Sequence, residues 1–524
     1  MDTNTPEFSW RTRNETLQKL SPQSEVECLI IGGGIVGAGL ARELAIRGIQ
    51  TLLVEKSDFA SGTSSKSSKL IHGGLRYLEM YDFRLVFEAL SERHWLLKTH
   101  PHLVHPLQFS IPFYEKKNAP PAQRSSFVID AGLWLYDALS LFHSPFFHGK
   151  HSKDKMLQVF PKLKSEGLSH GFYYADAMML DDELVLETVY DAVKRGATCL
   201  NYTQALRVAA KDKNGFHEVY IQDQMGAPSP GMMEVKPIRI LAKNVIVCVG
   251  PWTERIGAKI VEGSVKKLRP SKGVHFVVPW TRFPIESSLV MYAADKRIVF
   301  AIPRKDLGNG AEMVIIGTTD SPETRSPDEV FADHDDIEYL LRIVDNYFPD
   351  AKLTRSDIVS TYAGVRPLID DGAESEAATS REHEIWRNPA GVVFMAGGKY
   401  TTFRKISQEI ADFAFPRTHT SAFERASKEQ LSTPESYAQR NSGEKVWGRF
   451  NSGWIEWKLK HHAPCNLSDI VFRRMPLWLQ GVKVPAETLS QIAQIAAPFF
   501  GWDSKRVQKE IEETTSLLAK NFVK

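Results

Sequence analysis

Residues 26–37 read VECLIIGGGIVG, a short apolar and β-branched run that passes directly into glycines spaced as G-x-G-x-x-G. These glycines are Gly32, Gly34 and Gly37. In a dinucleotide-binding turn the first glycine permits the tight turn and the second lets the backbone approach a pyrophosphate. The third lets the helix pack closely on the strand. The pattern therefore predicts a strand, a turn, and a helix whose N-terminus faces phosphates.

The following segment supplies the rest of a βαβ unit. Residues 38–47 have the apolar spacing of a helix, Gly48 ends it, and residues 51–54 (TLLV) are a second predicted strand. Glu55 then stands about 20 residues after the glycines, where an acid accepts hydrogen bonds from the adenosine ribose hydroxyls. We therefore predict dinucleotide binding. The glycines alone do not choose between NAD and FAD.

A polar stretch takes the place of an ordinary third strand. Residues 61–69 read SGTSSKSSK, and the apolar and basic segment LIHGGLRY follows at once at 70–77. Hydroxyls and backbone N–H groups suit a pyrophosphate and a polar ring system, whereas a flexible linker would not lead directly into an ordered segment. The candidate cofactor ligands here are Thr63, Ser64, Ser65, Ser68, Lys69, Leu70 and His72.

The composition is that of a globular protein with more than one domain. A chain of 524 residues is too long for one core, so two or three domains are expected. The net charge of +2 argues against nucleic-acid binding. Four scattered cysteines without a CxxC pair fit a reducing compartment, and neither a disulfide framework nor a metal site.

Two further segments bear on membranes. The polar residues 1–25 predict a short frayed extension and neither a signal peptide nor a membrane anchor. No apolar run reaches the roughly 18–20 residues of a spanning helix. The nearest run is 127–142 (FVIDAGLWLYDALSLF), which predicts a buried helix. A helix lying in a membrane interface is the alternative.

Longer motifs throughout the chain resemble one family, the FAD-dependent glycerol-3-phosphate dehydrogenases of the aerobic, quinone-linked type. LIHGGLRYLE and GVRPL are the most specific of these motifs. The set comprises IGGGIVGAGLA (31–41), TSSKSSKLIHGGLRYLE (63–79), GFYYADAMMLDDELVL (171–186), SKGVHFVVP (271–279), STYAGVRPLIDD (360–371), MAGGKYTTFRKI (395–406) and NLSDIVFRRMPLWL (466–479).

The resemblance implies an α/β fold with a discontinuous, Rossmann-like FAD-binding domain of the glutathione-reductase or amino-acid-oxidase type. A β-sheet substrate domain and a helical C-terminal domain complete the expected architecture. The predicted boundaries are 25–97, 168–256 and 360–420 for the FAD-binding domain, 98–167 and 257–359 for the substrate domain, and 421–524 for the C-terminal domain.

The resemblance also implies a set of substrate ligands around a phosphate. Arg76 and Tyr77 of GGLRY, Arg366 of GVRPL, Arg381 of ATSRE and Lys399 of GGKYTT match the family motifs. Arginine forks bind a phosphate dianion in a fixed plane, so the residue types suit this role. Taken alone, each of these cations is more often a surface ion-pair partner. Arg366 is the exception, because it lies between an apolar approach and Pro367-Leu368, where a solvated arginine is less natural.

A second strand–glycine–helix motif is expected at the other end of the cofactor. Residues 392–395 predict a strand that ends at Gly397 and Gly398, and a helix follows from about Thr401. In flavoproteins of this type the helix N-terminus faces the flavin and stabilises its negative charge. Gly250 follows another strand, 245–249, on the cofactor side.

The reaction implied is oxidation of sn-glycerol 3-phosphate to dihydroxyacetone phosphate, with hydride passing to flavin N5. His275 is the first candidate for the base because a neutral imidazole titrates near working pH. Lys399 and Arg366 could polarise the forming carbonyl. A hydrogen-bonded core histidine is the alternative for His275. Asp176, Asp181 and Asp182 are interpreted as residues that hold the fold.

Quinone-linked turnover implies a protein at the inner face of the cell membrane, bound peripherally. The tail residues Trp447, Trp454, Trp457, Lys458, Lys460, Arg473, Arg474 and Trp478 have the composition of an interfacial surface, with tryptophans of a helical core as the alternative. A homodimer is left open. The rival functions are an oxidase that uses oxygen, an amine or amino-acid oxidase, and a flavin-binding scaffold without turnover.

Overall fold

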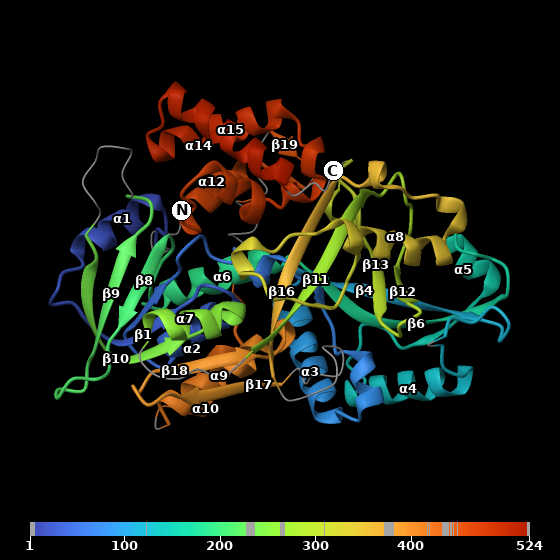
Figure 1. Ribbon diagram of the computed structural model, residues 1–524, viewed down its shortest axis with the longest axis horizontal. Helices are drawn as coiled ribbons and strands as arrows, with labels where there is room; N and C mark the ends of the chain where they lie inside the picture. Colours follow the sequence, from blue (N-terminus) through green and yellow to red (C-terminus); the bar gives the residue numbers. More distant parts are fainter. Residues whose placement is uncertain are drawn as a thin grey trace.

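In the computed structural model of the protein, two large sheets lie beneath a group of C-terminal helices (Figure 1). The structure describes residues 6–121, 123–226, 236–261, 268–308, 310–370, 382–416, 418, 420–431, 440, 443, 445–447 and 449–520.

The first sheet is built around β1 (Glu25–Ile31), which lies parallel between β2 (Thr51–Val54) and β10 (Ile238–Val247). Beyond them, β7 (Thr198–Leu200) pairs with β2 and β18 (Val393–Gly397) pairs with β10, both in parallel. The carboxyl ends of these strands therefore meet at one edge. The antiparallel strands of the sheet are β8 (Thr203–Val208), β9 (His217–Asp223) and β17 (His383–Arg387).

Both faces of this sheet are covered. Side chains of a strand alternate between faces, so Cys28 and Ile30 of β1 pack among helices α2 (Ile35–Ile46), α6 (Asp181–Lys194) and α9 (Phe403–Ala414). The neighbouring β1 residues pack on the other face with β8 and β9. The predicted strand–turn–helix–strand unit is confirmed, although α2 begins at the glycine turn, before the predicted start at residue 38.

The second sheet contains two long antiparallel pairs. β4 (Val104–Tyr114) pairs with β6 (Leu168–Met179), and β11 (Leu268–Pro279) pairs with β16 (Ser360–Ile369). The predicted short strands at 275–278, 298–301 and 313–317 lie in this sheet. The remaining strands are β3 (Leu70–Ile71), β5 (Gly149–Ser152), β12 (Ser288–Tyr292), β13 (Ile298–Arg304), β14 (Met313–Gly317) and β15 (Ser321–Pro322).

The two sheets share segments of the chain. β6 and β16 fall in ranges predicted for the FAD-binding domain, 168–256 and 360–420, yet both hydrogen-bond within the second sheet. Segments that lead into the first sheet thus begin in the second. The domain boundaries given above stay a prediction.

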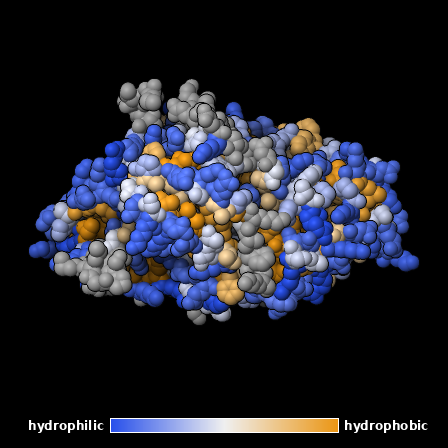
Figure 2. All heavy atoms as spheres, turned by 90° about the horizontal axis from the view of Figure 1, so that it is seen from above, coloured by the Kyte–Doolittle hydropathy of each residue, from blue (hydrophilic) through white to orange (hydrophobic). Residues whose placement is uncertain are grey.

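The C-terminal region packs its aromatic residues inward. Its main helices are α12 (Ser452–His461), α14 (Ala486–Phe500) and α15 (Ser504–Lys520). Trp454, Trp457 and Trp478 are buried, as are Lys458 and Arg474. Seen from above, hydrophilic residues predominate on this face, with apolar patches between them (Figure 2). The interpretation of the tail as an interfacial surface is therefore wrong, and the alternative of core tryptophans is confirmed.

Two other predicted segments differ from expectation. The N-terminal segment is not frayed throughout, because α1 (Trp10–Lys19) is capped by Ser9, and its Arg13 is buried in an ion pair with Asp223 at 2.6 Å. The long apolar run forms α4 (Ser126–Leu139). Only one face of α4 is buried, since Phe127 is 81% exposed. Among the helices that the structure describes, none has both the length and the apolar character needed to cross a bilayer.

Candidate functional site

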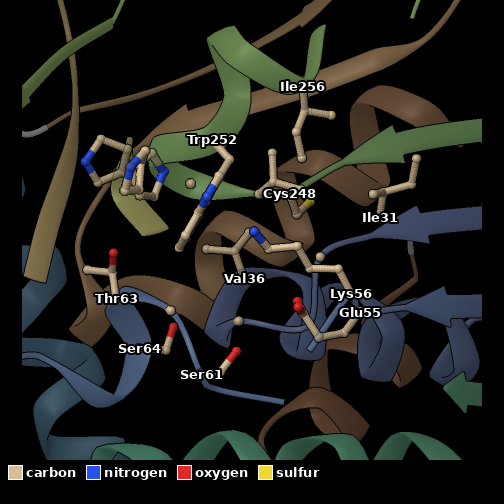
Figure 3. A pocket seen from close by; sticks show the side chains of 18 of the residues that line it. Ile31, Val36, Glu55, Lys56, Ser61, Thr63, Ser64, Cys248, Trp252 and Ile256 are labelled. Carbon is tan, nitrogen blue, oxygen red and sulfur yellow. The ribbon is translucent and has the colours of Figure 1, made fainter. Parts of the chain in front are cut away.

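A first cavity of about 520 Å³ lies at the carboxyl ends of β1, β2 and β10, where open α/β sheets bind their ligands. Figure 3 shows Trp252 above this cavity and Ser61 and Ser64 below it. The predicted residues that line it are Gly32, Gly34, Glu55, Thr63, Ser64, Gly250, Gly397, Gly398 and Lys399.

The glycine turn has the geometry that a pyrophosphate requires. Gly32 has a φ of +112°, in the region that favours glycine. A Cβ on Gly37 would overlap the carbonyl oxygen of Gly32, so only glycine lets α2 approach β1 this closely. Gly34 is the N-cap of α2, and the N–H of Ile35 donates to Ser64 Oγ at 3.0 Å. The N-terminus of α2 therefore faces the cavity.

Glu55 stands at the end of β2, where backbone donors fix its carboxylate. Oε2 accepts from the N–H of Gly33 at 2.7 Å, and Oε1 accepts from the N–H of Ser57 at 2.9 Å. Burial raises the pKa of the Glu55 carboxyl, and these two hydrogen bonds oppose the rise. Each carboxylate oxygen has a further lone pair, so the predicted contact with ribose hydroxyls fits this arrangement.

The serine-rich segment divides into residues that line the cavity and residues that hold the segment in place. Thr63 Oγ1 donates to the carbonyl oxygen of Val365 at 2.7 Å. The ammonium of Lys69 is buried in an ion pair with Asp181, and it also donates to the carbonyl oxygen of Ser65 at 3.2 Å. Ser65 and Lys69 line neither of the two cavities that the structure shows around this segment. Their side chains hold the segment in place, and their contact with the cofactor stays a prediction.

A second cavity of about 1120 Å³ adjoins the first on the side of the second sheet. It contains the predicted substrate residues Arg76, Tyr77, His275, Arg366 and Lys399. The two cavities adjoin, because they share lining residues along one border. That border is lined by Thr63, Lys66, Ser67, Pro367, Gly398, Lys399 and Tyr400.

Arg366 projects from β16 with its guanidinium held on one side. Nη1 forms an ion pair with Asp320 Oδ1 at 3.1 Å, and Nη2 donates to Thr318 Oγ1 at 3.2 Å. Asp320 also accepts a short hydrogen bond from Ser271. These contacts orient the planar fork before any ligand binds, which reduces the entropy lost on binding.

Two other cations line the second cavity together with Arg366. Arg76 belongs to the short helix η2 (Leu75–Met80). Lys399 Nζ lies 3.6 Å from the centroid of the Tyr77 ring, a cation–π contact that joins two predicted ligands. Arg381 lies outside the described residues.

The segment after β18 prepares a second helix N-terminus. Gly397 and Gly398 each have a φ of +81°. Lys399 then caps the short helix η8 (Tyr400–Thr402), which leads into α9. Thr401 Oγ1 donates to the carbonyl oxygen of His72 at 3.4 Å, and His72, Leu70 and Ser68 line the second cavity. The positive end of the helix dipole therefore lies at the border of the two cavities.

His275 lies on β11 with its ring in the wall of the second cavity. Nε2 is 2.8 Å from Ser68 Oγ, and the ring stacks on Tyr362. Burial, then the positive charges of Arg366 and Lys69, hold the pKa of His275 well below its usual range. The imidazole is therefore neutral at working pH. His275 is buried, as a core histidine would be, and it also lines the second cavity, as a base must. Its position is therefore compatible with both interpretations.

The acidic residues interpreted as structural have structural partners. Asp176 accepts hydrogen bonds from Arg93 Nη1 at 2.6 Å and from Tyr136 at 2.9 Å. Asp181 pairs with Lys69 at the first turn of α6. These contacts confirm that both carboxylates hold buried segments together.

Three residues that line the cavities are not among the candidate ligands predicted from the sequence. Lys66 lies at the border of both cavities, and burial lowers its pKa. Trp252 covers the first cavity, and Asp320 orients Arg366. The sequence places Lys66 inside the serine-rich segment and Trp252 directly after Gly250 and Pro251, which is the only signal it offers for them.

The residues present fit FAD. The first cavity supplies a glycine cradle, a helix N-terminus and a buried acid for a dinucleotide. The border with the second cavity supplies a second helix N-terminus where a ring system would lie beside the cations.

Comparisons with known proteins agree with this geometry. The family model described as FAD dependent oxidoreductase matches residues 27–403. The glycerol-3-phosphate dehydrogenase of Synechocystis sp. is 37% identical over 409 residues, which are 76% of this chain and 71% of that protein. The aerobic glycerol-3-phosphate dehydrogenase of Bacillus subtilis is 32% identical over 411 residues, 78% of this chain and 70% of that protein.

Solved structures share the fold. The glycerol-3-phosphate dehydrogenase from Bacillus halodurans complexed with FAD has a TM-score of 0.72 at 24% identity and covers 98% of both chains. The L-α-glycerophosphate oxidase from Mycoplasma pneumoniae has a TM-score of 0.55 at 17% identity, over 75% of this chain and 95% of that one. With the glycine turn, the linked cavities and these relatives, the chain belongs to the FAD-dependent oxidoreductases and, among them, to the glycerol-3-phosphate dehydrogenase family, with FAD as its cofactor.

Proposed function

We propose that this protein oxidises sn-glycerol 3-phosphate to dihydroxyacetone phosphate and passes the electrons to a membrane quinone. The observation that carries the proposal is the second cavity, in which Arg76, Arg366 and Lys399 line the space that adjoins the cofactor cavity. A dianionic phosphate is the ligand that several cations in one concave site favour. The names of the curated relatives support the same substrate.

Binding of the phosphate is assigned to the cations. The guanidinium of Arg366 is already oriented by Asp320 and Thr318, so it can donate hydrogen bonds to phosphate oxygens with little loss of side-chain entropy. Lys399 and Arg76 approach from η8 and η2, and Arg381 is proposed to complete the set. These contacts fix the far end of the substrate and leave its secondary alcohol at the border of the cavities.

Proton transfer is assigned to His275. FAD, when bound, supplies the acceptor for the two electrons and the hydrogen that leave the secondary carbon. The hydroxyl proton passes to the neutral imidazole. A bound phosphate dianion in the same cavity would favour the protonated ring that this step forms.

The test is to add candidate phosphates to the FAD-loaded protein without oxygen and to follow the loss of the oxidised flavin spectrum. Glycerol 3-phosphate is expected to bleach it and glycerol is not. Arg366→Ala is expected to raise KM roughly 10- to 100-fold, the cost of removing hydrogen bonds to a charged group. Arg366→Lys keeps the charge but loses the fork, and recovers only part of this. Arg239→Ala, which breaks the exposed pair with Glu218, is the control.

An unchanged KM and turnover in Arg366→Ala would remove the phosphate assignment. Bound FAD that no substrate bleaches would indicate a scaffold without turnover. Bleaching by amines or amino acids instead would indicate an amine or amino-acid oxidase.

The quinone proposal rests on an apolar surface at the mouth of the second cavity. Tyr81, Phe83, Val128 and Leu135 line the cavity and are also exposed. They continue into the outer face of α4, where Trp134 is 61% exposed. Exposed apolar patches of this kind mark membrane or partner contacts. This face lies below the second sheet, away from the C-terminal helices (Figure 1).

The surface and the acceptor are tested separately. Phe127→Glu with Trp134→Glu is expected to abolish sedimentation with vesicles of phosphatidylethanolamine and phosphatidylglycerol, while Phe331→Glu, at an exposed phenylalanine elsewhere, leaves it intact. Retained sedimentation would remove this face as the contact. Reduction of a soluble quinone without peroxide supports the dehydrogenase. Stoichiometric hydrogen peroxide in air would establish the rival oxidase.

A further inference from the structure

Three neighbouring strands place Gly317, His275 and Tyr362 in one row. His275 of β11 pairs directly with Gly317 of β14 and with Tyr362 of β16. Directly opposed residues project from the same face of a sheet, so their side chains are neighbours. The imidazole stacks on the Tyr362 ring with centroids 4.6 Å apart and planes 10° apart. A Cβ on Gly317 would overlap the imidazole. The ring therefore occupies a slot with tyrosine on one side and bare backbone on the other.

Tyr362 is itself held in place by the C-terminal region. Its hydroxyl donates to the carbonyl oxygen of Ser67 at 3.1 Å. Trp478, on the short helix η10 (Leu477–Lys483), meets the Tyr362 ring edge-on with centroids 5.1 Å apart and planes 84° apart. A Cβ on Gly481 of η10 would overlap the carbonyl oxygen of Val359, just before β16, so this contact is close-packed.

The hydrogen bonds of His275 leave its orientation to this packing. Nε2 contacts Ser68 Oγ at 2.8 Å. Nδ1 is buried and has no hydrogen-bond partner among the described residues. A catalytic histidine is commonly held by a carboxylate at its second nitrogen, and that device is missing from the described surroundings of this ring. The imidazole is therefore oriented by its stacking on Tyr362 and by its close packing on Gly317.

We propose that Tyr362 and Trp478 are positioning residues that brace His275, so that a side chain from the C-terminal region completes the geometry of the active site. The inference rests on the proposed function, in which His275 takes the proton of the substrate. It gives the buried tryptophan of η10 a role in the reaction that is separate from stabilising the fold.

The test compares single-turnover flavin reduction in FAD-loaded variants, measured without oxygen across a range of pH. Tyr362→Leu is expected to slow reduction by on the order of 10- to 100-fold, because the imidazole loses its stacking partner. Tyr362→Phe keeps the ring and recovers most of the rate. Trp478→Leu is expected to slow reduction less than Tyr362→Leu, and Trp478→Phe less still. KM stays close to that of the parent, since the phosphate ligands are untouched.

The decisive comparison uses a His275→Gln background. There, Tyr362→Leu is expected to have no further effect, because its contribution acts through the imidazole. If Tyr362→Leu slows His275→Gln by the same factor as the parent, or leaves the parent rate unchanged, the brace is overturned. FAD content measured by absorbance identifies variants that fail to fold, and Trp478→Leu then carries the comparison in the parent and in the His275→Gln background.

A spectroscopic measurement separates this inference from the proposed function. In protein with ¹⁵N-labelled histidine, the imidazole signal that disappears in His275→Gln identifies the ring. It is expected to be sharp and insensitive to pH in the parent. In Tyr362→Leu it should broaden or begin to titrate. If glycerol 3-phosphate fails to bleach the parent flavin, the proposed function is lost, while this signal still decides the brace. An unchanged signal in Tyr362→Leu overturns it.

Discussion

Arg474 and Asp58 form a fully buried ion pair between the C-terminal region and the loop that follows β2. Nη2 of Arg474 lies 2.9 Å from Oδ1 of Asp58, and both side chains are completely shielded from solvent. Arg473 reaches the same carboxylate. The next residue is Phe59, whose ring a Cβ on Gly33 would overlap. The pair therefore ties the C-terminal region to the glycine turn of the cofactor cavity.

Replacing Arg474 with Met is expected to lower the free energy of unfolding by about 3–5 kcal/mol, because it leaves the Asp58 carboxylate buried without its main partner. Urea unfolding of the FAD-free protein measures this. Glu286→Gln is the control, since its pair with Lys305 has side chains 46% and 50% exposed, and such pairs contribute under about 1 kcal/mol. Equal losses in both variants would contradict the prediction.

Gly37→Ala is expected to yield protein without FAD. The added methyl would overlap the carbonyl oxygen of Gly32 and push α2 away from the glycine turn. The ratio of flavin to protein absorbance after purification measures the loss. Gly132→Ala on α4 is the control, because a Cβ there meets nothing within 4 Å. Normal FAD content in Gly37→Ala would show that the turn tolerates the methyl.

Trp252 is expected to retain FAD in the first cavity. Its Nε1 donates to Asp328 Oδ2 at 3.0 Å, and Lys56 pairs with the same carboxylate at 2.7 Å. Trp252→Ala should raise the Kd of FAD on the order of 10-fold, because a large apolar surface is lost. Asp328→Asn should raise it only slightly, since exposed pairs are weak. Quenching of FAD fluorescence on binding measures both, and the reverse order would show that the ion pair is what retains the cofactor.

Acid is expected to destabilise the fold through its buried histidines. Burial lowers the pKa of His100 to about 3, whereas a histidine in the unfolded chain titrates near 6.5. Below that pH the unfolded chain binds a proton that the folded chain does not, so the free energy of unfolding falls as the pH drops from about 6.5 towards 3. Above about 6.5 the group has no effect.

The slope for one such site approaches about 1.4 kcal/mol per pH unit. His100→Gln is expected to be less stable than the parent at pH 7.5, and this difference should shrink at pH 5. Urea unfolding at the two pH values measures it. His334→Gln serves as the control, because His334 is exposed. A difference that stays constant with pH would contradict the prediction.

Local features of the fold could be predicted from the sequence, whereas contacts between residues far apart in the chain could not. Strand 51–54 and the acid after it could be placed because β-propensity, glycine spacing and a terminal carboxylate all act locally. Lys69 was assigned to the cofactor because it follows a run of hydroxyls, but its partner Asp181 lies more than a hundred residues further along the chain. A contact of that separation leaves no local signal. Arg366 could be named from its motif, while its orientation by Asp320 could not.

The run 127–142 shows the same limit for a prediction that is based on hydrophobicity. Its composition indicated a helix, and α4 is one, yet nothing in the run states which face meets solvent. The tail tryptophans show that composition alone does not locate a segment. Aromatic and basic residues occur together at membrane surfaces and also in cores that bury paired charges.

The sequence by itself determined the βαβ unit, the dinucleotide-binding glycine turn and the family, because these depend on short-range spacing and on motifs that are read directly. Only the tertiary structure decided which cations share a cavity, that His275 stacks between β14 and β16, and that Trp478 supports the stack from the C-terminal region. Those relationships arise from strand register and from packing between distant segments, and such contacts are set by the whole fold.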